Sequence, residues 1–325
     1  MIKIDLITGM LGAGKTTLLL KYADYLIRQG LHIAVLENDF GAVNVDMAFL
    51  HELPADRCTV SAVVGGGDPD CHRRRFKTQL ISLAMQQVGR VIVEPSGIFD
   101  MDEFFDTLCE PPLDRWYEVG SILTVADAAS PELLSTEMEY LLASEAACCG
   151  KVVVSKLEQT GESADAVRDR VLAHINRAML GIQCDRQLRP AELLVKPWDT
   201  LTDDDLSMLS NAGYRGANYV KLFHSDMLHS GVHYFMHLAI AREQIVPTVQ
   251  AILDDPQCGQ IYRIKGSLPN GTVGWLRLNA AGGEIALNPA PLGQPVLIVI
   301  GDALDKNAID RHFQTVNSDP GYLSV

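Results

Sequence analysis

Residues 9–17 read Gly-Met-Leu-Gly-Ala-Gly-Lys-Thr-Thr, and this stretch decides the fold of the 325-residue chain. Its three glycines let the backbone turn tightly, so that N–H groups and the start of a following helix surround a phosphate chain. Lys15 is placed to reach the β- and γ-phosphates, and the Thr16 hydroxyl is suited to Mg²⁺. We expect the phosphate contacts to come from Gly12, Ala13, Gly14, Lys15, Thr16 and Thr17.

The segments beside the glycine stretch support this interpretation. Residues 2–8 are mostly apolar and predict a strand, whereas residues 15–28 carry leucines and a tyrosine at helical spacing and predict a helix. A phosphate-binding loop works between such a strand and such a helix. The alternative, an ordinary glycine-rich turn, has no need of that context. The sequence therefore predicts a nucleoside-triphosphate-binding domain.

Strands and helices continue to alternate after the first pair. Alternation of this kind predicts an α/β fold, with a parallel sheet covered by helices on both faces and ligands at the carboxyl ends of its strands. The further expected strands are residues 32–36, 88–93, 121–125 and 151–155, and the expected helices are residues 76–87, 102–108, 132–148, 162–179 and 202–209.

The pattern changes after residues 211–216, a glycine-containing stretch that predicts a linker. We expect a first domain over residues 1–212 and a smaller α+β domain over residues 217–325. Its expected elements are strands at residues 219–223, 233–240, 260–265, 274–278, 284–287 and 295–300, and a helix at residues 242–253.

Acidic residues follow two of the expected strands. Residues 91–97 read Val-Ile-Val-Glu-Pro-Ser-Gly, where Glu94 can hold a metal ion or its water and the Gly97 N–H can sense the γ-phosphate. Asp39 follows the second strand as a candidate for Mg²⁺ or the attacking water, with Glu37 as the alternative. The structural alternatives are a plain turn and a solvated loop. We assign catalysis to Lys15, Asp39 and Glu94, and Mg²⁺ to Thr16, Glu37, Asp39 and Glu94.

Residues 152–158 read Val-Val-Val-Ser-Lys-Leu-Glu and are candidates for base recognition. GTPases commonly carry Asn-Lys-x-Asp at this position, and here Ser155 and Glu158 replace the Asn and the Asp. The Lys156 stem would pack over guanine, while the Glu158 carboxylate accepts hydrogen bonds from N1–H and N2–H₂. Adenine does not offer that pair of donors. The alternatives are an ATPase and an ordinary polar strand end.

Composition limits the classes of partner. The formal net charge of −14 argues against non-specific binding to nucleic acid or to an anionic membrane. The amino terminus does not resemble a secretion signal, and no apolar run approaches the length of a membrane span. Seven scattered cysteines fit a reducing compartment. We expect a cytoplasmic protein.

Taken together, these residues resemble the CobW-type metallochaperone GTPases, relatives of the UreG and HypB nickel-insertion GTPases. The resemblance rests on the glycine stretch, residues 37–41, 94–97, 189–191, 262–266 and 299–301, of which only the glycine stretch is highly specific alone. It implies GTP and Mg²⁺ as cofactors, a client metalloenzyme or cofactor-dependent enzyme as partner, and a nucleotide-dependent homodimer.

One departure from the family pattern concerns transition metals. The family usually carries Cys-x-Cys-Cys where residues 65–72 read Gly-Gly-Gly-Asp-Pro-Asp-Cys-His, so that this motif is degenerate. Cys71 and His72, joined by Asp68, Asp70 or Cys58, would form a harder substitute site for Zn²⁺, Co²⁺ or Ni²⁺. A metal-free loop is the favoured interpretation.

Histidines of the second domain offer another candidate set. His229, His233 and His237 would share one face of a helix, and in the expected strand His233 and His237 still share a face. Satisfied or solvated histidines are the favoured interpretation.

Two roles stay open at the level of the sequence. The first is GTP hydrolysis that drives delivery of a metal or metallocofactor, or maturation of a partner enzyme. The second is a metal-independent GTP switch that remodels or reactivates a partner, for example a cobalamin-dependent enzyme, and the missing cysteines favour it more than usual for this family. An arginine finger is not obvious, so intrinsic turnover should be slow.

Overall fold

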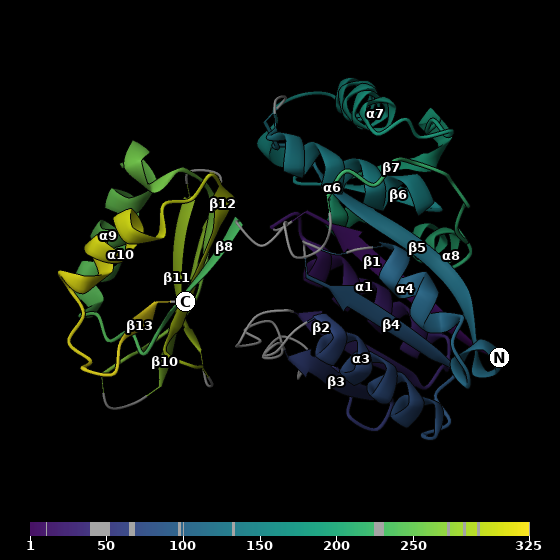
Figure 1. Cartoon of the computed structure of the whole chain (residues 1–325), viewed down its shortest axis with the longest axis horizontal. Coiled ribbons are helices and arrows are strands. Elements are labelled where there is room, and N and C mark those ends of the chain that lie inside the picture. The colour runs from purple at the N-terminus through teal and green to yellow at the C-terminus, as the bar shows by residue number, and fades with distance from the viewer. Residues whose placement is uncertain are drawn as a thin grey trace. The chain divides into compact units, whose positions relative to one another are not determined.

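The computed structural model describes residues 1–10, 12–39, 53–64, 69–96, 99, 101–131, 134–223, 231–271, 274–281, 284–290 and 293–324, except the side chains of residues 39, 64, 69, 70 and 302. These residues form two compact units, one through residue 223 and one from residue 231 (Figure 1). Within the described residues, none of the helices combines the length and the apolar character required to cross a bilayer.

The first unit is built on a seven-stranded sheet in the order β3-β2-β4-β1-β5-β6-β7, and every neighbouring pair is parallel. Its inner strands are almost continuously apolar because both faces are covered. The strands are β1 (Ile2–Gly9), β2 (Ile33–Asp39), β3 (Cys58–Val64), β4 (Arg90–Pro95), β5 (Tyr117–Asp127), β6 (Lys151–Ser155) and β7 (Leu193–Val195).

Helices cover both faces of this sheet, as the sequence predicts (Figure 1). Helices α1 and α8 contact each other and the sheet, while α3, α4, α6 and α7 form a separate series of contacts. The helices of this unit are α1 (Lys15–Arg28), α3 (Pro69–Ala84), α4 (Met101–Leu108), α5 (Leu113–Trp116), α6 (Thr136–Cys148), α7 (Ala164–Gly181) and α8 (Asp203–Ser210), with short 3₁₀ turns η1 (Leu157–Gln159), η2 (Pro190–Glu192) and η3 (Trp198–Thr200).

The sequence missed the two edge strands, β3 and β7. Strand β3 reads Cys-Thr-Val-Ser-Ala-Val-Val, with polar residues among the apolar ones, and β7 has only three residues. Residues 219–223 were expected to form a strand but do not.

The first unit continues past the boundary predicted at residues 212–217. Main-chain hydrogen bonds run from Ile122 N to Gly213 O (3.0 Å) and from Val220 N to Ile182 O (2.8 Å). The first bond holds the predicted linker against β5 and the second holds Val220 against the end of α7, so backbone groups on both sides of the predicted boundary find partners within the first unit.

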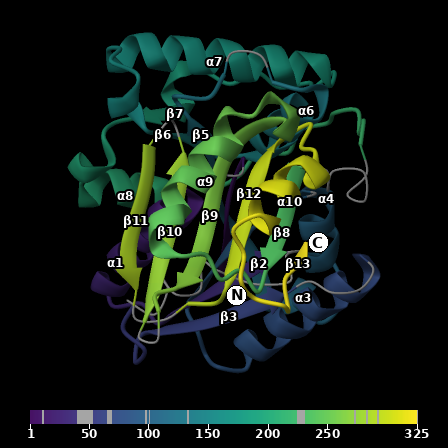
Figure 2. The same ribbon diagram turned by 90° about the vertical axis from the view of Figure 1, so that its left-hand side faces the viewer.

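The second unit has a six-stranded sheet in the order β11-β10-β9-β12-β8-β13, with every neighbouring pair antiparallel. Helices α9 and α10 lie over one face of it (Figure 2). In the core between the sheet and these helices, the ring centroids of Phe235 and Phe313 are 4.8 Å apart. The elements are β8 (Val232–Met236), α9 (Arg242–Asp254), the 3₁₀ turn η6 (Pro256–Cys258), β9 (Gln260–Pro269), β10 (Trp275–Ala281), β11 (Glu284–Ala290), β12 (Val296–Asp302), α10 (Lys306–Gln314) and β13 (Leu323–Ser324).

The histidine set of the second domain is only partly described. His233 lies on β8, where burial, followed by the charge of Lys306, lowers its pKa. The strand ends at Met236 and His237 has a φ of 56°, so the predicted strand to residue 240 is too long and the shared face is lost. His229 lies outside the described residues.

Candidate nucleotide-binding site

The glycine loop joins β1 to α1 and needs glycine at particular positions. Gly12 has a φ of 80° and Gly14, the residue before the helix, a φ of 105°, both in the left-handed region. A Cβ at Gly9 would lie 2.4 Å from Val125 O, so the loop also packs too closely on β5 for any side chain there. Leu11 lies outside the described residues. The described part of the loop therefore has the tight backbone that phosphate binding requires.

Lys15 is the first residue of α1, and its side chain is almost fully buried. Its ammonium group donates to the main-chain oxygens of Gly9 (2.8 Å) and Met10 (3.4 Å). These contacts hold a positive charge against the loop backbone, at the place where the sequence predicted a phosphate-binding lysine.

Oxygen ligands meet beside the start of α1. The Thr16 hydroxyl donates to Oε1 of Glu94 at 2.8 Å. Glu94 on β4 pairs in register with Glu37 on β2, so the two side chains share one face, and both residues are buried. Burying two neighbouring carboxylates is costly without a cation or a proton. Hydroxyl and carboxylate oxygens are the ligands Mg²⁺ prefers, so these residues fit that ion.

Two further predicted residues cannot be placed in this cluster. The Asp39 side chain and all of Gly97 lie outside the described residues. Their roles in holding Mg²⁺ or sensing the γ-phosphate stay predictions.

The candidate base-recognition residues follow β6. Lys156 has a φ of 54° and precedes η1, in which Glu158 is exposed to solvent. The Lys156 ammonium forms an ion pair with Asp127 at the end of β5. Sequence reasoning missed Asp127, because its meeting with Lys156 depends on the pairing of β5 with β6.

Trp198 is another residue that sequence reasoning missed. Its Nε1–H donates to Val154 O at 2.9 Å, and a Cβ at Gly14 would lie 3.2 Å from the edge of its ring. Trp198 in η3 therefore packs against the glycine loop and against β6. In the sequence it stands in a short Lys-Pro-Trp-Asp segment without any pattern that connects it to the loop.

Glu145 lies beneath the loop on α6 and was also missed. Its side chain is inaccessible to solvent, and neither carboxyl oxygen makes a well-formed hydrogen bond to the described residues. Burial raises the pKa of Glu145 to about 8, against the opposing influence of the Lys15 ammonium and the Gly9 N–H. The only sequence signal was an acid within a helix of apolar and small residues.

Cys71 and His72 begin α3 and do not form the predicted substitute metal site with Cys58. Burial, followed by the charge of Arg75, lowers the pKa of His72 to about 4, whereas Cys71 is half-buried. Cys58 opens β3 and Val64 ends it, and six residues of strand span roughly 20 Å. Cys58 therefore lies at the amino end of β3, far from the end of the strand that leads to α3. Asp68 and the side chain of Asp70 lie outside the described residues.

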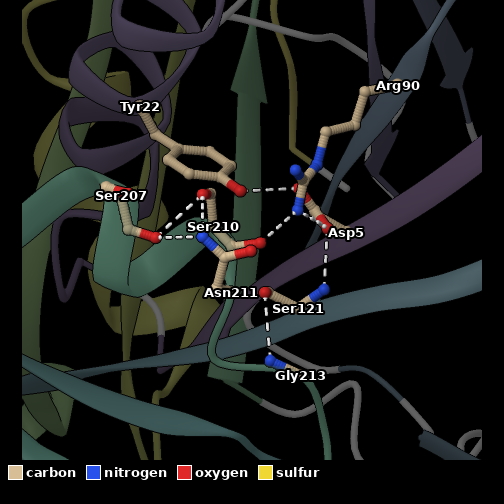
Figure 3. Close-up of polar contacts among 8 residues, drawn as sticks. All are labelled: Asp5, Tyr22, Arg90, Ser121, Ser207, Ser210, Asn211 and Gly213. Carbon is tan, nitrogen blue, oxygen red and sulfur yellow. Dashed lines mark hydrogen bonds and ion pairs between the residues drawn. The ribbon is translucent and has the colours of Figure 1, made fainter.

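A buried polar network occupies the amino ends of the central strands (Figure 3). Asp5 accepts from Tyr22 Oη (2.7 Å), Ser121 N (2.7 Å) and two guanidinium nitrogens of Arg90. Arg90 also donates to Ser210 O at 2.7 Å, which connects the sheet to α8. The network thus ties β1, β4, β5, α1 and α8 together.

Comparison with known proteins identifies the family. The model of the CobW/HypB/UreG nucleotide-binding domain matches residues 3–182. The zinc chaperone YjiA of Escherichia coli K12 is 29% identical over 183 residues, which cover 54% of this chain and 55% of YjiA. The zinc chaperone YeiR of the same organism is 32% identical over 139 residues, which cover 42% of this chain and 40% of YeiR. Each match spans about half or less of the relative.

Solved structures of related proteins also align. The Zn(II)-bound YjiA GTPase from E. coli covers 98% of this chain and 99% of its own length, at 17% identity and a TM-score of 0.39. HypB from Helicobacter pylori, in complex with nickel, covers 63% of this chain and 82% of its own length, at 13% identity and a TM-score of 0.40. The family model alone matches more than half of the chain, which therefore belongs to the CobW/HypB/UreG nucleotide-binding family.

Proposed function

We propose that this protein binds GTP with Mg²⁺ and hydrolyses it to drive delivery of a metal or metallocofactor, or maturation of a partner enzyme. One observation carries the nucleotide part: a buried Lys15 on the glycine loop stands next to a Thr16 hydroxyl that donates to Glu94. The description of two relatives as zinc chaperones supports the metal part.

The protein groups contribute to hydrolysis in different ways. Loop N–H groups and the Lys15 ammonium stabilise negative charge that spreads over the phosphate oxygens during in-line attack by water. Thr16, Glu94 and Glu37 would hold Mg²⁺, and the bound ion would neutralise further phosphate charge. Asp39 is the alternative ligand or the residue that orients the attacking water.

Preference for guanine rests on the turn after β6. Lys156 provides an apolar stem for the base, and its ion pair with Asp127 limits the positions that its ammonium can take. Glu158 is exposed and supplies an acceptor for the guanine N1–H and N2–H₂. Equal affinities for GTP and ATP would remove this assignment and favour the ATPase alternative.

The central test is Lys15→Ala in the full chain. We expect binding or turnover of GTP to fall by at least about 10²-fold, because a charge-stabilising donor is lost. Quenching of Trp198 fluorescence by bound nucleotide gives a direct binding signal, because Trp198 lies against the loop. Lys21→Ala is the matched control, since Lys21 lies on the same helix and its ion pair, a long 3.5 Å contact, is with the exposed Asp199. Unchanged GTP binding and cleavage in Lys15→Ala would refute the proposal.

A metal-independent GTP switch is the second candidate function. It is favoured by the degenerate motif of residues 65–72, where Cys71 is the only thiol. Purified protein that binds and hydrolyses GTP but takes up neither Zn²⁺, Co²⁺ nor Ni²⁺ would support the switch, and stoichiometric metal binding would support delivery.

The nucleotide-dependent homodimer is tested by measuring the mass in solution with and without a GTP analogue.

A further inference from the structure

A cluster of three metal-ligating side chains lies in the second unit, and it contains none of the histidines that the sequence analysis considered there. Asp255, Cys258 and His312 present one ligand atom each, and these atoms lie within 4.8 Å of one another. The His312 Nε2 and an Asp255 oxygen are 2.9 Å apart. Among the described residues, this is the group of three Asp, Glu, Cys or His side chains whose ligand atoms lie close enough together to hold one metal ion.

Local structure explains how the cluster is held. Asp255 precedes the 3₁₀ turn η6 and Cys258 ends it, and side chains three residues apart in such a turn point to the same side. The turn is fixed by hydrogen bonds from Gln257 N to the Asp255 carboxylate (2.9 Å) and from Cys258 N to Asp255 O (3.0 Å). His312 comes from the last turn of α10. Two ligands therefore come from a rigid turn and one from a packed helix.

The solvent exposure of the three side chains suits a site that an ion can enter and leave. Cys258 is fully buried, while the side chains of Asp255 and His312 are each about a quarter exposed. The thiol thus forms the floor of the cluster, and the carboxylate and imidazole form its solvent-facing side. This arrangement gives a path for the ion without exposing the sulfur.

We propose that Asp255, Cys258 and His312 bind a divalent transition-metal ion of the Zn²⁺ or Co²⁺ class. One sulfur, one nitrogen and one oxygen ligand suit such borderline ions rather than Mg²⁺ or Ca²⁺. Tetrahedral ligation at about 2.0–2.3 Å places ligand atoms about 3.3–3.8 Å apart, so adjustments of about 1 Å are enough. Three protein ligands leave a fourth position for water or for a donor of a receiving protein.

Charge and proton balance are consistent with this site. On binding, the Cys258 S–H bond breaks, a sulfur–metal bond forms and the proton passes to the buffer. The resulting thiolate and the Asp255 carboxylate together neutralise a divalent ion. Burial, followed by the charge of Asp255, raises the pKa of the Cys258 thiol to about 11, and the nearby Arg311 only partly opposes this shift, so the metal ion itself has to displace the proton.

A purely structural role makes a different prediction. The pairing of Asp255 with His312 also ties α10 to η6, as an ordinary helix-to-turn contact would. That role needs no thiol and gives no spectroscopic signal with a metal ion. As a place for cargo the site rests on the proposed delivery function, but it can be tested without nucleotide, so the two proposals can fail separately.

The test is a Co²⁺ titration of the reduced, metal-free full chain without nucleotide. We expect a thiolate-to-cobalt charge-transfer band that saturates at one equivalent and disappears in Cys258→Ser. His312→Gln and Asp255→Asn should each weaken binding at least tenfold. Asparagine retains the oxygen that caps the turn, so the Asp255→Asn result reports the lost charge. Because His312 is partly exposed, its variant keeps the test valid even if Cys258→Ser does not fold.

Cysteine variants in the first unit supply the controls. Cys184→Ser removes a half-buried thiol elsewhere, and Cys71→Ser removes the thiol of the degenerate motif. Both should retain the band and its one-equivalent end point. The absence of a band in the parent protein would overturn the proposal, and so would a band that survives in folded Cys258→Ser or disappears in Cys71→Ser.

Discussion

Asp5 and Glu145 are both inaccessible to solvent in the first unit, but their surroundings are opposite. Asp5, near the amino ends of the central strands, accepts four hydrogen bonds from Tyr22, Ser121 and Arg90. Glu145, beneath the glycine loop, has no well-formed hydrogen bond at its carboxyl group among the described residues. A buried carboxyl group is thus stabilised by hydrogen bonds at Asp5, whereas at Glu145 burial raises its pKa.

This difference separates the part of the sheet around Asp5 from the carboxyl ends of the strands beside the glycine loop. A fully partnered carboxylate fixes β1, β4, α1 and α8 in one arrangement (Figure 3). Because burial raises the pKa of Glu145, its carboxyl group ionises less readily beside the Lys15 ammonium, which donates to Gly9 O and Met10 O. A charged carboxylate at Glu145 would compete with phosphate for Lys15.

The largest expected effect comes from breaking the Asp5 network. Arg90→Met would leave the Asp5 charge buried without its cation and should cost about 3–5 kcal/mol in the free energy of unfolding. Chemical denaturation measures it. Arg28→Met is the control, because Arg28 pairs with Asp24 and Asp203 at the surface and should lose about 1 kcal/mol or less. Equal losses in both variants would show that the buried network has no special role.

A smaller effect should appear in the pH dependence set by Glu145. Its pKa is about 8 in the folded protein and 4.5 without burial, so between these values the native state binds more protons than the unfolded state. Stability should therefore fall as pH rises through this window, by up to about 1.4 kcal/mol per pH unit, and no further above it. Glu145→Gln removes this contribution.

Unfolding of Glu145→Gln and the parent at pH 5.5 and 7.5 measures that slope. The variant should gain about 2 kcal/mol relative to the parent across this interval. Glu118→Gln, which changes an exposed acid on β5, should show no such gain. Parallel pH profiles for parent and Glu145→Gln would mean that Glu145 is ionised in the folded state.

The sequence predicted the elements beside the glycine loop better than the edge strands of the sheet, for physical reasons. The bounds of α1 and β6 match the expected ones, because a glycine loop and an apolar run are local signals. Edge strands β3 and β7 have no such signal, since β3 mixes polar with apolar residues and β7 has only three residues. Glu145 and Trp198 reach the loop from far along the chain, so their roles depend on strand order. The Asp255–Cys258 spacing is local, but His312 joins it only after α10 packs.

Tyr22→Phe should give the smallest of these effects, and it tests the Asp5 network at a single hydrogen bond. It removes one of four donors to Asp5 while Arg90 keeps its contacts, and hydrogen bonds to charged groups contribute about 1.5–3 kcal/mol. We expect a loss near the lower limit, about 1–2 kcal/mol, in the same denaturation assay. GTP binding should be unchanged, because Tyr22 lies away from Lys15 and Thr16 on the helix. A selective loss of GTP binding would show that the two ends of the sheet are coupled, so that Asp5 tunes the loop as well as supporting it.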